Sequence, residues 1–278
     1  MSSTIIPTTR YHANEPLTRR LVAHTRAIVR FRHLVRYLVS TSLRTENTGT
    51  VFGFFWWVLD PMLSMAVYTV FIVVIMRRGH HAYPVFVLSA LIPWEFFTTA
   101  IRNGMALSLS KERAMRQVAF PKGVIPLATT LASAAHFVFA IGVLLIFAVP
   151  FGIYPTGATP FLLVIAVVQF VFTLGLTYLF ASLNLFFRDT AHLTSYVFRF
   201  WFYLSPALYA ATLVPARYRH VFSLNPFYTF FNSYRATVFD GQMPHIAPLG
   251  ILAGVSVLLL LVGFGCFVWS EPKFAKLN

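Results

Sequence analysis

The chain has 278 residues, of which 58% are hydrophobic and 11% are charged, and its mean hydropathy is +0.70. Because soluble domains carry about 25% charged residues, this composition excludes an ordinary water-soluble globular protein. The formal net charge of +14 does not indicate nucleic-acid binding, since the basic residues stand at the ends of apolar stretches. Flanking charge of this kind is typical of membrane topology and of contact with anionic lipids.

Residues 1–16 are expected to form a flexible tail, and no cleavable signal peptide is evident because the first apolar stretch begins only near Val51. Residues 17–44 are too charged to cross a membrane, but their apolar side chains share one helical arc about 100° wide. This pattern predicts an amphipathic helix at the cytoplasmic interface with its apolar face in lipid; a helix packed on another protein is the alternative. The arc comprises Leu17, Leu21, Ile28, Phe31, Val35, Leu38 and Val39, and Arg19, Arg26 and Arg30 project from the opposite side.

Long apolar stretches then follow along residues 51–269, and a helix needs about 20 apolar residues to cross about 30 Å of hydrocarbon. They predict an all-α membrane domain with six spans. Eight arginines between Arg10 and Arg44 favour a cytoplasmic N-terminus, and an even number of crossings returns the tail, residues 270–278, to the same side. The spans are expected at residues 51–76, 83–107, 124–150, 160–187, 190–213 and 246–269.

Residues 214–245 are aromatic and partly apolar, but Pro215, Pro226, Gly241 and Pro244 interrupt them. The segment is therefore too broken for a span. It suits short helices that dip into the outer leaflet and return, where protein or a water-filled cavity satisfies the backbone.

The chain lacks the sequence motifs of several common catalytic and nucleotide-binding sites. It contains no GxxxxGK[ST] loop for gripping ATP phosphates, no CxxC pair, no HExxH helix and no GxSxG elbow. The adjacent pair His80 and His81 has no further metal ligands close by in the sequence. We therefore expect no catalytic residues, no metal and no cofactor bound by this chain.

Charged residues inside the predicted spans are the clearest functional signal, because an ionisable group in hydrocarbon costs about 2.5 kcal/mol or more. Asp60, Glu95 and Arg199 are the candidates. Arg199 either contacts a phosphate or sugar, or extends its side chain to the membrane interface. Glu95 and Arg102 stand seven residues apart on one helical face, which predicts an ion pair or two polar groups facing the bundle interior.

Aromatic residues concentrate in the span expected at 190–213. Sugars stack on such rings, so the rings would suit a glycan conduit, but aromatic residues also fill cores and interfacial belts, and the residues alone favour that packing role. The conduit candidates are Trp56, Tyr196, Phe200, Trp201 and Tyr203.

Five segments resemble ABC-2-type permeases that export bacterial surface polysaccharides, in the same order along the chain. They are LVSTSLRTENTGTVFGFFWWVLDPMLSMAVYTVFI, LIPWEFFTTAIRNG, MRQVAFPKGVIPLA, NLFFRDTAHL followed by YLSPALY, and LNPFYTFFNSYRATVFDG. Together they extend from about Leu38 to Lys273; the carboxylate of Glu95 and the tail before Glu15 depart from the pattern.

The resemblance implies a homodimeric permease in the bacterial inner membrane, with both termini cytoplasmic. Two copies of a separate ATPase subunit would bind ATP and magnesium. The cargo would be a glycan on a polyprenyl diphosphate, of the O-antigen, galactan or teichoic-acid type, passed from the inner to the outer leaflet.

Within that frame, three groups of residues receive hypothetical roles. Arg32, Arg36, Arg44 and Arg199 would attract the lipid diphosphate, because arginine favours charge-assisted phosphate contacts. The five aromatic candidates would guide the glycan. Residues 111–122 would receive the push of the ATPase, with Arg113, Arg116, Phe120, Pro121 and Lys122 as the coupling residues.

The sequence leaves three alternatives to a polysaccharide exporter. An exporter of drugs or small lipids shares the architecture but needs no long conduit. A membrane enzyme acting on lipid-linked sugar should show paired acidic or His and Asp residues in its loops, and the chain has only eight acidic residues. A channel should show a polar filter, and none stands out.

Overall fold

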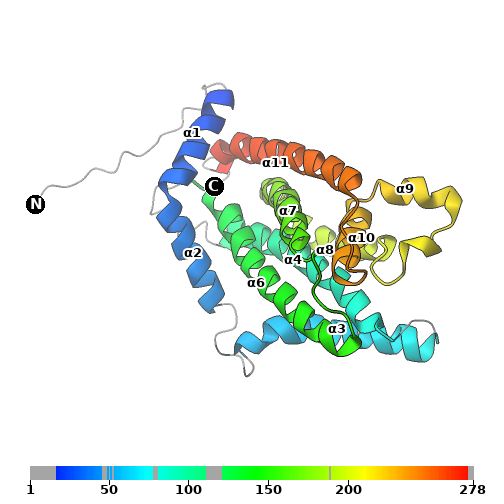
Figure 1. Ribbon diagram of the computed structural model, residues 1–278. Helices are drawn as coiled ribbons and strands as arrows, with labels where there is room; N and C mark the ends of the chain where they lie inside the picture. The colour runs from blue at the N-terminus through cyan, green and yellow to red at the C-terminus, as the bar shows by residue number, and fades with distance from the viewer. Residues whose placement is uncertain are drawn as a thin grey trace, which may run out of the picture.

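The computed structural model describes residues 17–45, 49, 51, 53–77, 81–110, 121–187 and 189–274, and the regular structure in these ranges is helical (Figure 1). This confirms the predicted all-α fold class. The helices are α1 (Leu17–Arg30), α2 (Arg32–Thr45), α3 (Trp56–Thr69), α4 (Tyr83–Ser110), α6 (Val124–Ala148), α7 (Phe161–Phe186), α8 (Thr190–Leu204), α9 (Arg219–Ser223), α10 (Pro226–Val238) and α11 (Ile246–Phe274). A π-helical stretch, η2 (Val70–Ile75), prolongs α3, and the 3₁₀ turns are η1 (Gly53–Phe55), η3 (Val149–Phe151), η4 (Ala211–Leu213) and η5 (Ala216–Tyr218).

The described residues contain five helical stretches that are long and apolar enough to cross a membrane. They are Trp56–Ile75, Tyr83–Ala106, Val124–Phe151, Phe161–Phe186 and Ile246–Glu271, and they fall on five of the six predicted spans. The protein is therefore a multi-pass membrane protein.

The span expected at residues 190–213 is not one continuous helix. Helix α8 has 15 residues, so its length is about 22 Å, less than the ~30 Å of a bilayer core. It ends where Pro206 forces the preceding Ser205 into an extended conformation, with ψ at 148°. The predicted helix was too long by nine residues at this end, and a sixth crossing stays a prediction.

Helix α4 is the centre of the bundle, because it contacts α3, α6, α7, α8 and α10. A buried glutamine links three of these helices. The Gln169 side chain of α7 donates to the carbonyl oxygen of Pro93 in α4 at 2.7 Å, and accepts a hydrogen bond from the Tyr234 hydroxyl of α10 at 2.8 Å. In a membrane domain such interhelical hydrogen bonds fix helix positions that apolar packing leaves less defined.

The two N-terminal helices meet at Phe31 and lie along one side of the bundle (Figure 1). Helix α1 contacts α11 and α2 contacts α6. The predicted amphipathicity is present, since Arg19, Arg26 and Arg30 are exposed. However, the apolar face was expected in lipid, and part of it instead packs on the chain's own α6, where Val35 clusters with Val124 and Ala128.

The segment after α8 folds back on the bundle through short helices. Helix α10 is deeply packed, and its Phe227, Phe230 and Phe231 side chains are fully buried. Its Arg235 side chain donates hydrogen bonds to the carbonyl oxygens of Pro206 and Ala207 just beyond α8. This arginine therefore holds the turn that ends α8 against α10.

Candidate functional site in the membrane domain

A polar hollow of about 320 Å³ lies between α3, α4 and α8. Its volume corresponds to about ten water molecules of liquid. Its polar lining comes from three segments that are far apart in sequence. Helix α3 supplies Ser64 and Tyr68, α4 supplies Trp94, Glu95, Thr98 and Arg102, and α8 supplies Ser195, Arg199 and Tyr203.

The ionisable groups of this hollow do not neutralise one another by direct contact. Among the described residues, Glu95 has no ion-pair partner within 4 Å, and neither do Arg102 and Arg199. The Arg102 guanidinium instead donates to the Thr99 hydroxyl at 3.3 Å. The structure therefore shows no ion pair between Glu95 and Arg102. Both side chains line the same hollow, where Arg102 is exposed and Glu95 is half-buried.

A smaller hollow of about 110 Å³ adjoins the first and shares Glu95 with it. Asp60, Trp56 and His136 line this second space. The charge of Asp60 acts on the Glu95 carboxyl group from that side, and the charge of Arg102 acts on it from the other. Glu95 is thus the point at which the two hollows meet.

The aromatic conduit candidates separate into different surroundings. Trp201 is a packing residue: its ring lies 5.3 Å from that of Phe227, and its indole nitrogen donates to the Asn225 side chain at 2.9 Å. Tyr196 and Phe200 are 69% and 68% exposed on the outer face of α8. Tyr203 lines the larger hollow and Trp56 lines the smaller one.

The arginines predicted to attract the lipid diphosphate do not all share one place. Arg32, Arg36 and Arg44 are exposed on α2, which packs on α6. Arg199 is on α8, which contacts α4 and α7. The structure therefore groups Arg199 with Glu95 and Arg102, and not with the α2 arginines.

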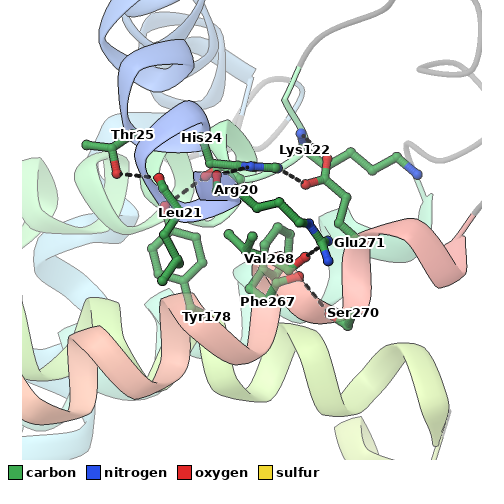
Figure 2. A network of polar contacts seen from close by, with 11 residues as sticks. Arg20, Leu21, His24, Thr25, Lys122, Tyr178, Phe267, Val268, Ser270 and Glu271 are labelled. Carbon is green, nitrogen blue, oxygen red and sulfur yellow. Dashed lines mark hydrogen bonds and ion pairs between the residues drawn. The ribbon is translucent and has the colours of Figure 1, made fainter. Parts of the chain in front are cut away.

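A second polar cluster, which the sequence analysis did not identify, connects the N-terminal helix α1 to the end of the last helix, α11 (Figure 2). His24 of α1 forms an ion pair with Glu271 of α11, and Glu271 also accepts a hydrogen bond from the backbone N–H of Lys122 at 3.2 Å. Arg20 donates to the carbonyl oxygen of Val268 at 2.5 Å. The signal available in the sequence was the spacing of Arg20 and His24, one helical turn apart; the structure adds that both are buried.

The His24 imidazole is 1% exposed, and its environment alters its pKa. Burial lowers the pKa, but the hydrogen bond and the negative charge of Glu271 raise it, so that the pKa ends above the usual 6.5. The Nδ1 atom lies 2.8 Å from the Arg20 carbonyl oxygen. Both ring nitrogens therefore face acceptors, which suits the doubly protonated imidazolium.

Two of the predicted coupling residues stand beside this cluster. Pro121 is buried and Lys122 is half-buried, and α6 begins at Val124 after the N-cap residue Gly123. Arg113, Arg116 and Phe120 lie outside the described residues.

Comparison with known proteins places the whole membrane domain in one family. No protein-family model matches the chain. The O-antigen export system permease protein RfbA of Myxococcus xanthus is 30% identical over 258 residues, which is 92% of this chain and 99% of that protein. Two proteins of the same description from Klebsiella pneumoniae are each 27% identical over 245 residues, covering 88% of this chain and 94% of theirs. Because the similarity to the Myxococcus protein extends over 92% of this chain at 30% identity, the chain belongs to the family of O-antigen export system permease proteins.

Proposed function

We propose that this chain is the membrane permease subunit of an ABC exporter that moves a polyprenyl-diphosphate-linked polysaccharide from the cytoplasmic to the outer leaflet. The polysaccharide is of the O-antigen, galactan or teichoic-acid type. The observation that carries the proposal is the 30% identity to an O-antigen export permease across 99% of that protein's length. The five apolar helices support the same membrane role.

The energy for transport comes from two copies of a separate cytoplasmic ATPase, which bind ATP and magnesium. This part rests on the sequence, which contains no phosphate-gripping loop. In the proposal both termini of the permease are cytoplasmic, and residues 111–122 receive the movement of the ATPase. Lys122 and Glu271 are hydrogen-bonded, so a displacement there would reach α11 and α1 directly.

The permease acts as a homodimer, with the glycan path between two copies of the chain. The hollow of about 320 Å³ among the described residues is too small to hold a polymer, so the proposal places the path between two copies. The outer faces of α3 and α8 are apolar and exposed, with Val67 at 67% and Phe200 at 68%. A second copy covering these faces would place Tyr196, Phe200 and Arg199 along the path.

The lipid diphosphate first meets the exposed arginines of α2, which are Arg32, Arg36 and Arg44. Their exposed guanidinium groups suit an anionic headgroup. Arg199 then acts later, inside the membrane domain.

The proposal is tested by producing the full-length chain with the ATPase subunit of an O-antigen exporter and purifying through a tag on this chain. We expect the ATPase to co-purify in equal amount, and polyprenyl-diphosphate-linked glycan to raise its turnover. Turnover stimulated only by small lipids or drugs would favour the alternative exporter. An isolated chain that captures no ABC ATPase would refute the transporter proposal.

A further inference from the structure

We infer that Glu271 is a positioning residue for energy coupling, because its carboxylate holds both α1, through His24, and the segment that precedes α6. The inference rests on the proposed function, in which residues 111–122 receive the movement of the ATPase. It goes beyond that proposal by assigning the connection to one ion pair and by making α1 follow the movement only while His24 carries its second proton.

The Glu271 carboxylate uses each of its oxygens on a different segment of the chain (Figure 2). Its Oε2 atom forms the ion pair with His24 of α1, and its Oε1 atom accepts the hydrogen bond from the Lys122 backbone N–H at 3.2 Å. The Glu271 side chain is only 13% exposed. Removing one partner from a buried ion pair leaves an uncompensated charge, so the three segments depend on one another for their positions.

The start of α6 is closely surrounded by three other helices. The Tyr178 hydroxyl of α7 donates to the carbonyl oxygen of Gly123 at 2.8 Å. A Cβ atom added at Gly123 would lie 3.7 Å from Ile28 of α1 and 3.8 Å from Phe267 of α11. A movement of the segment before α6 is therefore felt at α1, α7 and α11, and α1 follows it for as long as it stays docked on α11.

Two polar contacts dock α1 on α11, and they differ in their response to pH. Arg20 donates to the Val268 carbonyl oxygen at 2.5 Å, and an arginine keeps its proton at any pH that a protein tolerates. His24 faces two acceptors, which are Glu271 and, at 2.8 Å from its Nδ1 atom, the Arg20 carbonyl oxygen. A neutral imidazole has a single N–H group, so loss of one proton leaves one of these two acceptors without a donor.

The charges around His24 determine when that proton is lost. Among the described residues they are Arg20 of its own helix and Glu271 of α11, with Lys122 beside Glu271, whereas the basic residues of α2 are exposed. Burial lowers the pKa of His24 and so does the charge of Arg20, but the hydrogen bond and charge of Glu271 raise it above 6.5. The docking of α1 therefore weakens on the alkaline side of neutrality.

The N-terminal helices are built so that α1 can leave while α2 stays. The two helices meet at the single residue Phe31, and α2 remains packed on α6 through Val35. The exposed face of α1 carries both apolar and basic side chains, which suits a helix lying on an anionic membrane surface. These exposed residues are Arg19, Val22, Arg26, Val29 and Arg30.

Docking of α1 is measured on the full-length chain in nanodiscs of phosphatidylcholine and phosphatidylglycerol, without ATPase. Cys266→Ala removes the single cysteine, and nitroxide labels are attached at Val22→Cys of α1 and Leu261→Cys of α11, which are both exposed. Labelled chain is diluted with excess unlabelled chain, so that pulsed electron paramagnetic resonance reports the distance within one copy. Between pH 6 and pH 9 we expect the ratio of docked to released α1 to fall roughly tenfold, the effect of one lost strong hydrogen bond.

Variants assign this change to the ion pair. His24→Lys keeps a positive charge over the whole range and should stay docked at pH 9. His24→Gln and Glu271→Gln lack the ion pair and should show at pH 6 the released population that the parent shows at pH 9. His33→Gln removes an exposed imidazole of α2 and should behave as the parent does. Gel filtration of each variant checks its folding.

The coupling role is measured in the complex with the ATPase, as glycan exported per ATP hydrolysed. Comparing the parent with His24→Lys at each pH cancels the effects of pH on the ATPase itself. We expect equal values at pH 6, and by pH 9 a severalfold lower value for the parent while its ATP hydrolysis continues. A residue that only stabilised the fold would lower hydrolysis and export together.

Two results would overturn the inference. A label distance that stays constant from pH 6 to pH 9, or that is the same in His24→Gln as in the parent at pH 6, would show that α1 does not depend on the ion pair. Release of α1 with no loss of glycan per ATP would show that Glu271 takes no part in coupling. A chain that captures no ABC ATPase would refute the exporter and with it the coupling role, whereas the label distances, which need no ATPase, would still decide whether the ion pair docks α1.

Discussion

The backbone of α11 at Gly263 lies directly against the carbonyl oxygen of Gly175 in α7, and a Cβ atom on Gly263 would collide with that oxygen. A Cβ atom on Gly175 would come within 2.6 Å of the Leu260 backbone nitrogen. Neither obstacle is a flexible side chain, so the two helices would have to move apart. Small residues at such crossings are a regular device of helix packing in membranes.

We therefore predict that Gly263→Ala and Gly175→Ala each destabilise the protein by about 1–3 kcal/mol, the range for overpacked sites. The measurement is thermal unfolding of the purified chain in detergent. Gly254→Ala in the same α11 is the matched control, because nothing lies within 4 Å of its added Cβ. Equal midpoints for the Gly263 and Gly254 variants would mean that α7 and α11 are less closely packed than described.

Arg235 supports a second prediction. Its guanidinium lies 3.5 Å from the ring centroid of Phe86, and its hydrogen bonds go to the backbone carbonyls that follow α8. Replacing it with leucine leaves these carbonyls without donors, at about 1–3 kcal/mol for each buried group. We expect Arg235→Leu to lower the thermal midpoint and to expose residues 205–225 to protease.

The control for that experiment is Arg217→Leu, because Arg217 is exposed and only covers the Tyr218 ring at 4.6 Å. An exposed cation–π contact is worth about 0.5–1 kcal/mol, so this variant should stay close to the parent. If both arginine variants resisted protease equally, the turn after α8 would not depend on Arg235.

A third prediction concerns pH and the pair His24 and Glu271. Because the pKa of His24 is raised in the folded protein, its charge stabilises the fold. This stabilisation is complete below the unfolded pKa of about 6.5 and is lost as pH rises through the higher folded pKa. The thermal midpoint of the parent should therefore approach that of His24→Gln between pH 6 and pH 9.

His220→Gln, at an exposed histidine of α9, is the comparison for nonspecific effects of pH. The gap between this variant and the parent should stay constant over the same range. A constant gap for His24→Gln as well would show that the imidazole does not change its charge there.

A fourth prediction separates packing from transport on α8. Trp201→Phe removes the hydrogen bond to Asn225, which also caps α10 by accepting from the Phe227 backbone N–H at 3.0 Å. We expect a loss of about 1 kcal/mol in stability.

Phe200→Ala, at an exposed neighbour, should leave the thermal midpoint of the isolated chain unchanged but reduce glycan export by the complex. Unaltered export would remove Phe200 from the proposed path.

Hydropathy predicted most of the fold because a membrane span depends mainly on the length of an apolar stretch. Five helices lie where that length placed them. The end of α8 was misjudged because apolar residues continue beyond Pro206, although that proline was itself a visible stop signal. The apolar face of α2 was assigned to lipid because lipid and the side of α6 select the same residue types.

The candidate site was predictable only in part. The cost of intramembrane charge singled out Asp60, Glu95 and Arg199 individually. The grouping of Glu95 with Arg199 depends on a contact between helices about a hundred residues apart, and that of Glu95 with Asp60 on the packing of α3 against α4, which no local pattern reports. Trp201 shows the converse, since an aromatic residue in a core and one in a sugar path look alike in sequence.

The contacts of α1 with α11 also impose an order on biosynthesis. Arg20 and Val268 are 248 residues apart, and the ribosome must complete the last span before they can meet. At about 5–20 residues per second, α1 waits on the order of ten seconds or more after its own synthesis. During that time its buried residues have no permanent partner on α11. Helix α1 can therefore dock only after α11, the last helix of the membrane domain, has been synthesised.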